Sequence, residues 1–111
     1  MILDINTKLE AVLAGAVAAN QPEVHVFYAD WNASNEMTAP TLFRAALNST
    51  TDVTILAAPV ANPKREVLSM TLYNKDTATV TATIKTDDGT ERILVKKALA
   101  TLETLHFSKN A

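Results

Sequence analysis

The strongest constraint on this chain of 111 residues is a strict two-residue alternation in its C-terminal half. From Ala78 to Lys85, alanine, valine and isoleucine alternate with threonine and a final lysine. Because successive side chains of a strand point to opposite faces, this pattern predicts a half-buried antiparallel strand with Ala78 and Ala82 pointing inward. Asp88–Gly89 follows, and this pair suits the positive φ angles of a tight turn. The segment therefore predicts a β-hairpin that returns through Ile93.

Shorter patterns predict further strands, separated by turn residues, over residues 23–29, 53–57 and 66–73, with a last element over 102–108. The stretch from Trp31 to Asn48 lacks a clean period, and we interpret it as a long loop that allows a short helical turn over Leu42–Leu47. Five or six short strands of this kind are typical of a mainly β fold. We expect a small antiparallel β-sandwich or jelly-roll-like barrel spanning residues 21–111.

The first twenty residues follow a different pattern. Their apolar side chains fall at helical spacing, at Leu9, Val12, Leu13, Ala16 and Val17. Such a helix would end at the proline that follows Asn20 and Gln21. We keep two interpretations of residues 1–20: a short amphipathic helix packed on the domain, or an arm that docks on a neighbouring subunit.

Composition excludes several classes of function. The net charge is −2 and no basic face is evident, so we expect no nucleic-acid partner. The apolar stretch over residues 11–19 is too short to span a bilayer, and the N-terminus lacks the features of a signal peptide, which indicates a protein made in the cytoplasm with no membrane partner. Aromatic residues make up only 5% of the chain, which disfavours a small-molecule pocket.

The residues that carry most enzymatic chemistry are few or badly placed. Cysteine is absent, and the two glycines cannot form a phosphate-binding loop. His25 and His106 lie within apolar strand sequences without a nucleophile motif or metal-ligand spacing. The Asp87–Gly89 segment lacks the series of acids that a calcium loop needs. We therefore expect no catalytic residue, no metal and no cofactor, and predict a structural or binding protein rather than an enzyme.

Four large apolar side chains are not explained by strand alternation: Tyr28, Trp31, Met37 and Phe43. As anchors they could form the centre of a protein–protein contact. The other interpretation is that Trp31 caps the open end of the sandwich core. Both can hold if the core of this domain continues into a neighbouring subunit.

Four stretches together carry a resemblance to a known family. They are Leu9–Ala18, Ala57–Ala61, Leu72–Thr81 with its Tyr–Asn–x–Asp strand end, and Asp88–Leu105. In this order they resemble small virion structural proteins of tailed bacteriophages, although the segment from Asn32 to Asn48 departs from that pattern. The resemblance implies a particle component. Within that class, capsid cement or decoration proteins fit best by size, being small and often trimeric β-domains that clamp neighbouring capsomers.

These expectations define a hypothesis that the structure can be compared with. The chain would be a homotrimeric cement protein on the capsid exterior of a virion, with the major capsid protein as its partner. Its expected interface residues are Leu9, Val12, Leu13, Val17, Tyr28, Trp31, Met37 and Phe43. The alternative hypothesis is a tail-associated fibre, baseplate or adapter module, and a cell-wall hydrolase is the third.

Overall fold

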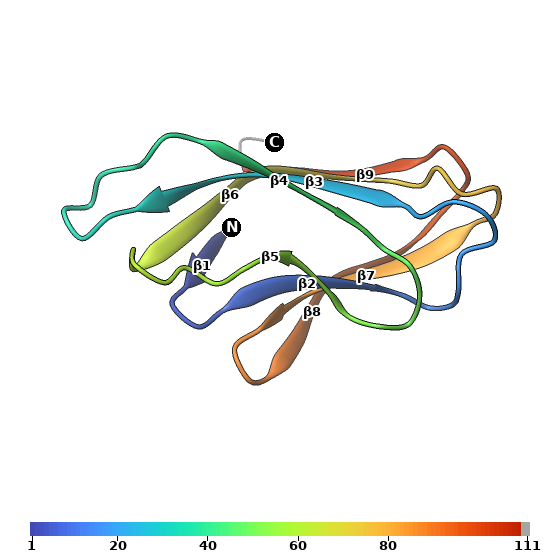
Figure 1. Ribbon diagram of the computed structural model, residues 1–111, viewed down its shortest axis with the longest axis horizontal. Coiled ribbons are helices and arrows are strands. Elements are labelled where there is room, and N and C mark those ends of the chain that lie inside the picture. The colour runs from blue at the N-terminus through green and yellow to red at the C-terminus, as the bar shows by residue number, and fades with distance from the viewer. Residues whose placement is uncertain (110–111) are drawn as a thin grey trace.

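The computed structural model describes residues 1–109, which form nine β-strands and no helix. The strands are β1 (Ile2–Asp4), β2 (Lys8–Leu13), β3 (Glu23–Trp31), β4 (Thr41–Ala46), β5 (Val53–Leu56), β6 (Lys64–Tyr73), β7 (Val80–Asp87), β8 (Glu91–Leu99) and β9 (Thr104–Ser108). They build two antiparallel sheets that face each other in a body of 46 × 27 × 20 Å (Figure 1). Within this part of the chain, no helix has the length and apolar character that a membrane crossing requires.

The long strand β6 organises the first sheet. One side of β6 pairs with β3, which in turn pairs with β4. β6 also pairs with two short strands, β1 along Lys64–Glu66 and β9 along Ser69–Tyr73. The second sheet has the order β5-β2-β7-β8, so β8 lies at its edge.

The core lies between the two sheets and is built by alternate side chains of the central strands. In β7, Val80, Ala82 and Ile84 are buried, as the alternation predicted, and Gly89 takes the positive φ of 105° that the hairpin turn needs. Ala78 is exposed and precedes the strand, so its predicted inward position is wrong. The buried apolar residues are Leu3, Leu9, Ala11, Leu13, Val24, Val26, Ala29, Leu47, Ile55, Leu56, Val67, Met70, Leu72, Val80, Ala82, Ile84 and Leu99.

The predicted N-terminal helix or arm is wrong. Residues 1–20 supply β1 to the first sheet and β2 to the middle of the second, between β5 and β7. Leu9, Ala11 and Leu13 of β2 point into the core and are at most 2% exposed. The apolar residues of this segment fit a two-residue period as well as a helical one. The segment forms a strand because one of its faces is buried against the facing sheet. Removing residues 1–20 would therefore remove a central strand rather than a detachable arm.

The segment interpreted as a long loop also differs from expectation. Residues Thr41–Ala46 form β4, which pairs with β3 from Tyr28↔Thr41 to Glu23↔Ala46, in place of the helical turn expected over Leu42–Leu47. β4 lies at a sheet edge and is exposed or half-buried along its length, so its side chains carry little hydrophobic alternation. β1, β2 and β4, none of which was predicted as a strand, bring the number of strands above the five or six expected.

Candidate docking surface

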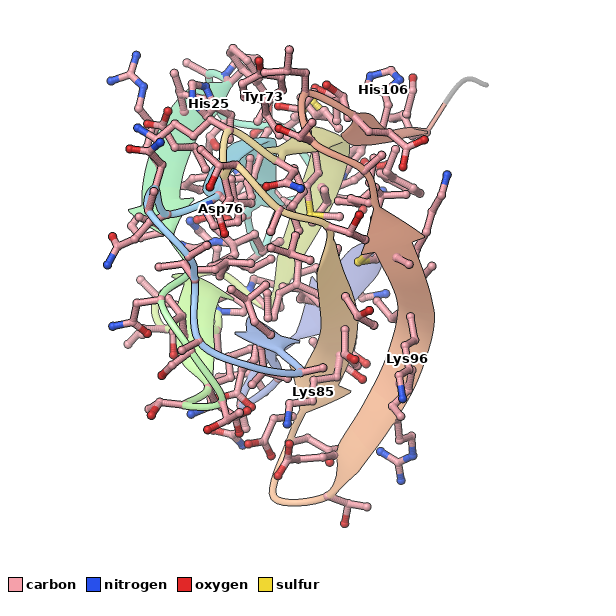
Figure 2. All side chains as sticks on the ribbon, turned by 90° about the vertical axis from the view of Figure 1, so that its right-hand side faces the viewer. His25, Tyr73, Asp76, Lys85, Lys96 and His106 are labelled. Carbon is pink, nitrogen blue, oxygen red and sulfur yellow. The ribbon has the colours of Figure 1, made fainter. Side chains whose placement is uncertain are left out.

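A buried polar cluster closes the end of the sandwich where three connections meet, and Asp76 lies at its centre (Figure 2). The Asp76 carboxylate accepts hydrogen bonds from the backbone N–H groups of Ala18 and Ala19, both at 2.8 Å, and of Asn20 at 3.1 Å. The backbone N–H of Thr77 donates a further bond at 2.8 Å. These donors favour the charged carboxylate and lower the pKa of Asp76 to about 2.

Asn74 joins the β8–β9 connection to this cluster. Its side-chain amide donates to the carbonyls of Ala78, Leu99 and Ala100 at 2.9–3.2 Å, while its Oδ1 accepts from the Asp76 N–H. The β2–β3, β6–β7 and β8–β9 connections are therefore fastened together by two adjacent buried side chains. The Tyr–Asn–x–Asp strand end noted in the sequence has a structural role in this fold, because both polar side chains are occupied by the chain itself.

A second charged cluster lies on the outer face of the second sheet. The Lys85 ammonium contacts Asp52 at 2.9 Å and also contacts Glu91. Both carboxylates raise the pKa of Lys85, that of Glu91 having the larger effect. Glu10 lies directly opposite Lys85 across the β2–β7 pair and contacts Lys8 at 3.4 Å.

This cluster contains the only set of carboxylates in residues 1–109 that could hold a metal ion. Oxygens of Glu10, Asp52 and Glu91 lie within 4.8 Å of one another. Glu10 is only 4% exposed, and its Oε1 has no hydrogen-bond donor. Burial raises the pKa of Glu10, and the nearby Asp87 carboxyl raises it further. Positive charge is already supplied to Asp52 and Glu91 by Lys85 and to Glu10 by Lys8, which leaves Glu10 Oε1 as the one carboxylate oxygen of this cluster that is buried without a partner.

The predicted aromatic interface is only partly assembled. Trp31 pairs with Met37 in an isolated β-bridge, and its indole N–H donates to the Glu66 carboxylate at 3.0 Å. The Tyr28 ring is covered by the Arg65 guanidinium, 4.6 Å from its centroid. Trp31 and Tyr28 are thus engaged within the chain.

The other members of the predicted interface fall into three groups. Phe43 and Met37 are about 40% exposed, on β4 and in the β3–β4 connection respectively. Val12 lies half-buried on the outer face of β2, and Val17 packs partly against the core. Leu9 and Leu13 are core residues and are inaccessible in the folded domain, so the docking role predicted for them is wrong.

The two histidines do not form a joint site. His25 of β3 and His106 of β9 each pair with Thr71, so the β6 strand separates them on one face of the first sheet (Figure 2). Neighbouring strands are about 4.8 Å apart, which places these two backbones roughly 10 Å from each other.

A groove of about 440 Å³, which we call the β8–β9 groove, runs between β8 of the second sheet and β9 of the first, where the two sheets diverge (Figure 1). Its lining residues are Met1, Met70, Ile84, Leu94, Val95, Leu105, His106 and Phe107. Apart from His106, every lining side chain is apolar. The sequence contained these residues, but alternation within a strand does not reveal which edge of a sandwich remains uncovered.

β8 forms one wall of this groove and is itself exposed (Figure 2). Ile93 is 66% exposed and Leu94 is 47% exposed, while Val95 is half-buried. A bulge in the β7–β8 pairing places Leu94 between the Ile84↔Val95 and Lys85↔Ile93 pairs. The groove, with Leu94 and Val95 of β8 in its wall, is an exposed apolar surface suited to receive another polypeptide.

Comparisons of this chain with protein families, curated proteins and solved structures find no match.

Proposed function

We propose that this chain is a structural protein of a tailed-bacteriophage virion, a capsid cement protein that clamps neighbouring capsomers. The observation that carries the proposal is the open, almost wholly apolar β8–β9 groove on a small two-sheet sandwich. Uncovered apolar surface of this kind marks sites of protein–protein contact. The resemblance of the sequence to small virion proteins supplies the kind of partner, namely the major capsid protein.

The polar cluster at the end of the sandwich supports a clamping role. A clamp must hold its shape under load, and Asn74 and Asp76 fasten three connections with hydrogen bonds of 2.8–3.2 Å. A single contact of the size of this groove need not be strong. Many copies on one shell, or a trimer that contacts several capsomers at once, raise the overall affinity without new contacts.

The first test is the copy number of the chain in purified particles, measured by quantitative mass spectrometry against the major capsid protein. We expect a copy number comparable to that of the capsid protein. A handful of copies per particle would instead assign the chain to the tail, as a fibre, baseplate or adapter module. Absence from particles would contradict the virion role altogether.

A second test asks whether the β8–β9 groove is the docking surface. Leu105→Ser places a hydroxyl in the groove, and we expect it to weaken binding of the purified protein to capsids that lack it. Val60→Ser is the matched control, because Val60 is 85% exposed and lies in the β5–β6 connection. Equal binding by both variants, with both folded as judged by circular dichroism, would contradict the assignment of the groove.

A further inference from the structure

β8 is the longest edge strand among the described residues. Its nine residues compare with three in β1, four in β5, five in β9 and six in β4. On one side β8 pairs with β7, and on the other it meets no strand of residues 1–109. A long, exposed edge presents a row of backbone donors and acceptors that can pair with another chain.

The side chains of β8 suit an added strand on both faces. Leu94 and Val95 line the β8–β9 groove, whereas Ile93 is paired with Lys85, whose side chain lies on the outer face of the second sheet. An incoming strand alternates its side chains between these two faces. Apolar side chains on one face of that strand would enter the groove and replace the missing wall beside β9.

The charges along β8 select among partners. Lys96 and Lys97 have no ion-pair partner within residues 1–109, and Arg92 has only an exposed contact with Asp88 at 3.3 Å. Lys97 pairs with Ala82, a buried core position, so it lies on the same side of the sheet as the groove. Cations of this kind on an edge strand discourage pairing with the wrong chain.

A second copy of β8 fits this edge less well than an acidic strand does. Antiparallel pairing of two copies about Leu94 places Arg92 of each opposite Lys96 of the other and Glu91 opposite Lys97, so repulsion and attraction offset each other. Pairing about the Leu94–Val95 bond places Arg92 opposite Lys97 without that compensation, and like charges directly opposite each other destabilise a strand pair. A strand with glutamate on its outer face would instead bring an opposite charge to Lys96, which pairs with Thr83 on the outer face of the second sheet.

We propose that β8 binds an extended, acidic segment of a partner protein by strand addition, with the apolar side chains of that segment in the β8–β9 groove. The proposal deepens the proposed function, on which it rests only for identifying the partner as a capsid subunit. Backbone hydrogen bonds supply affinity in this mode of recognition, and the pockets for alternate side chains supply specificity.

The test is a titration of the full chain, followed by amide NMR, with two synthetic peptides. In the first peptide valine and isoleucine alternate with glutamate, and in the second lysine replaces every glutamate. We expect the glutamate peptide to shift the amides of residues 91–97 and to bind at least tenfold more tightly than the lysine peptide, an advantage that salt reduces. Shifts confined to another face, or none on β8 at the highest peptide concentration, would overturn the proposal.

Charge-reversal variants sharpen the result. In K96E/K97E we expect the preference to reverse, so that the lysine peptide binds more tightly. K64E is the matched control, because Lys64 is an exposed cation at the start of β6 in the other sheet, and it should retain the preference of the parent chain. A preference that K64E abolishes as fully as K96E/K97E would overturn the assignment to β8.

Sedimentation of the free protein tests the competing occupant. A dimer that dissociates on Leu94→Glu would assign the edge to a second copy and overturn the proposal. The peptide tests are independent of the particle tests. If the chain is present at capsid copy number but the peptides do not bind β8, only the docking mode is contradicted. If a peptide binds β8 but the chain is absent from particles, only the virion role is contradicted.

Discussion

The connected end of the sandwich, where Asn74 and Asp76 fasten three connections together, differs from the β8–β9 groove in whether its side chains have partners within the chain. At the connected end, Asn74 and Asp76 are at most 1% exposed, and together they bond seven backbone N–H or carbonyl groups of other residues. Along β8, which borders the groove, Leu94 and Ile93 remain 47% and 66% exposed. Buried polar groups are costly unless they are paired, whereas an exposed apolar edge costs the folded chain little.

Because of this contrast, we expect the connected end to determine the stability of the fold and the groove to determine the binding of a partner. Substitutions at the connected end should reduce the free energy of unfolding and leave the groove intact in whatever fraction remains folded. Substitutions along the groove should leave stability nearly unchanged and act on partner binding. The following predictions test this separation, beginning with the largest expected effect.

Asn74→Ala should lower the free energy of unfolding by about 3 kcal/mol, because it removes four hydrogen bonds and leaves buried carbonyls without donors. Urea denaturation measures this directly. Asn48→Ala is the control, since Asn48 is exposed, and its effect should stay within about 0.5 kcal/mol. Similar losses in the two variants would show that the polar cluster is not a special support of the fold.

Acid should weaken the same cluster. The pKa of Asp76 is about 2 in the folded chain against an ordinary value of 3.8, so its stabilising effect is present above pH 4 and is lost as the pH falls towards 2. Thermal unfolding measured across this range should show a steeper fall for the parent chain than for Asp76→Asn. Parallel pH profiles for the two proteins would contradict this role of the carboxylate.

Lys85→Met should give a smaller loss of stability than Asn74→Ala, because the affected cluster is nearer to water. Without the ammonium, Glu10, Asp52 and Glu91 repel one another. We expect calcium to raise the Tm of this variant and to leave the Tm of the parent chain unchanged. A calcium response in the parent chain would show that Lys85 does not replace a metal ion there.

Leu94→Ser should have the smallest effect on folding, within about 0.5 kcal/mol, since Leu94 is already 47% exposed. Its effect should appear in binding of the glutamate peptide, which we expect to weaken. A large loss of stability in urea would break the separation between the two regions. It would show that the β8 edge supports the fold as well as the proposed docking.

The sequence predicted the parts of the fold whose side chains alternate against one buried face. The alternation over β7 and the Asp88–Gly89 turn are confirmed, and so is the mainly β, two-sheet architecture. β2 was misread because Leu9, Leu13 and Val17 fit a helical period as well as a strand period. Only the facing sheet, built from residues distant in sequence, distinguishes the two.

The candidate site was harder to predict than the fold. Trp31 and Tyr28 attracted attention as large aromatic residues, but Glu66 and Arg65 engage them within the chain. Leu94 and Leu105 look like ordinary strand residues in the sequence. Their significance depends on the divergence of the two sheets, which is a property of the whole fold and has no local signature.

The central position of β2 has a consequence for how the chain folds. β2 is the first strand of the second sheet to be synthesised, yet it pairs with β5 and β7, and the later of these two partners ends at Asp87. The second sheet therefore cannot close during synthesis until most of the chain has left the ribosome. Pairing between such distant segments slows folding, because the entropy of closing long loops is lost before the contacts form. We expect folding on a timescale of roughly milliseconds to seconds, as is typical of sandwiches with distant strand pairs.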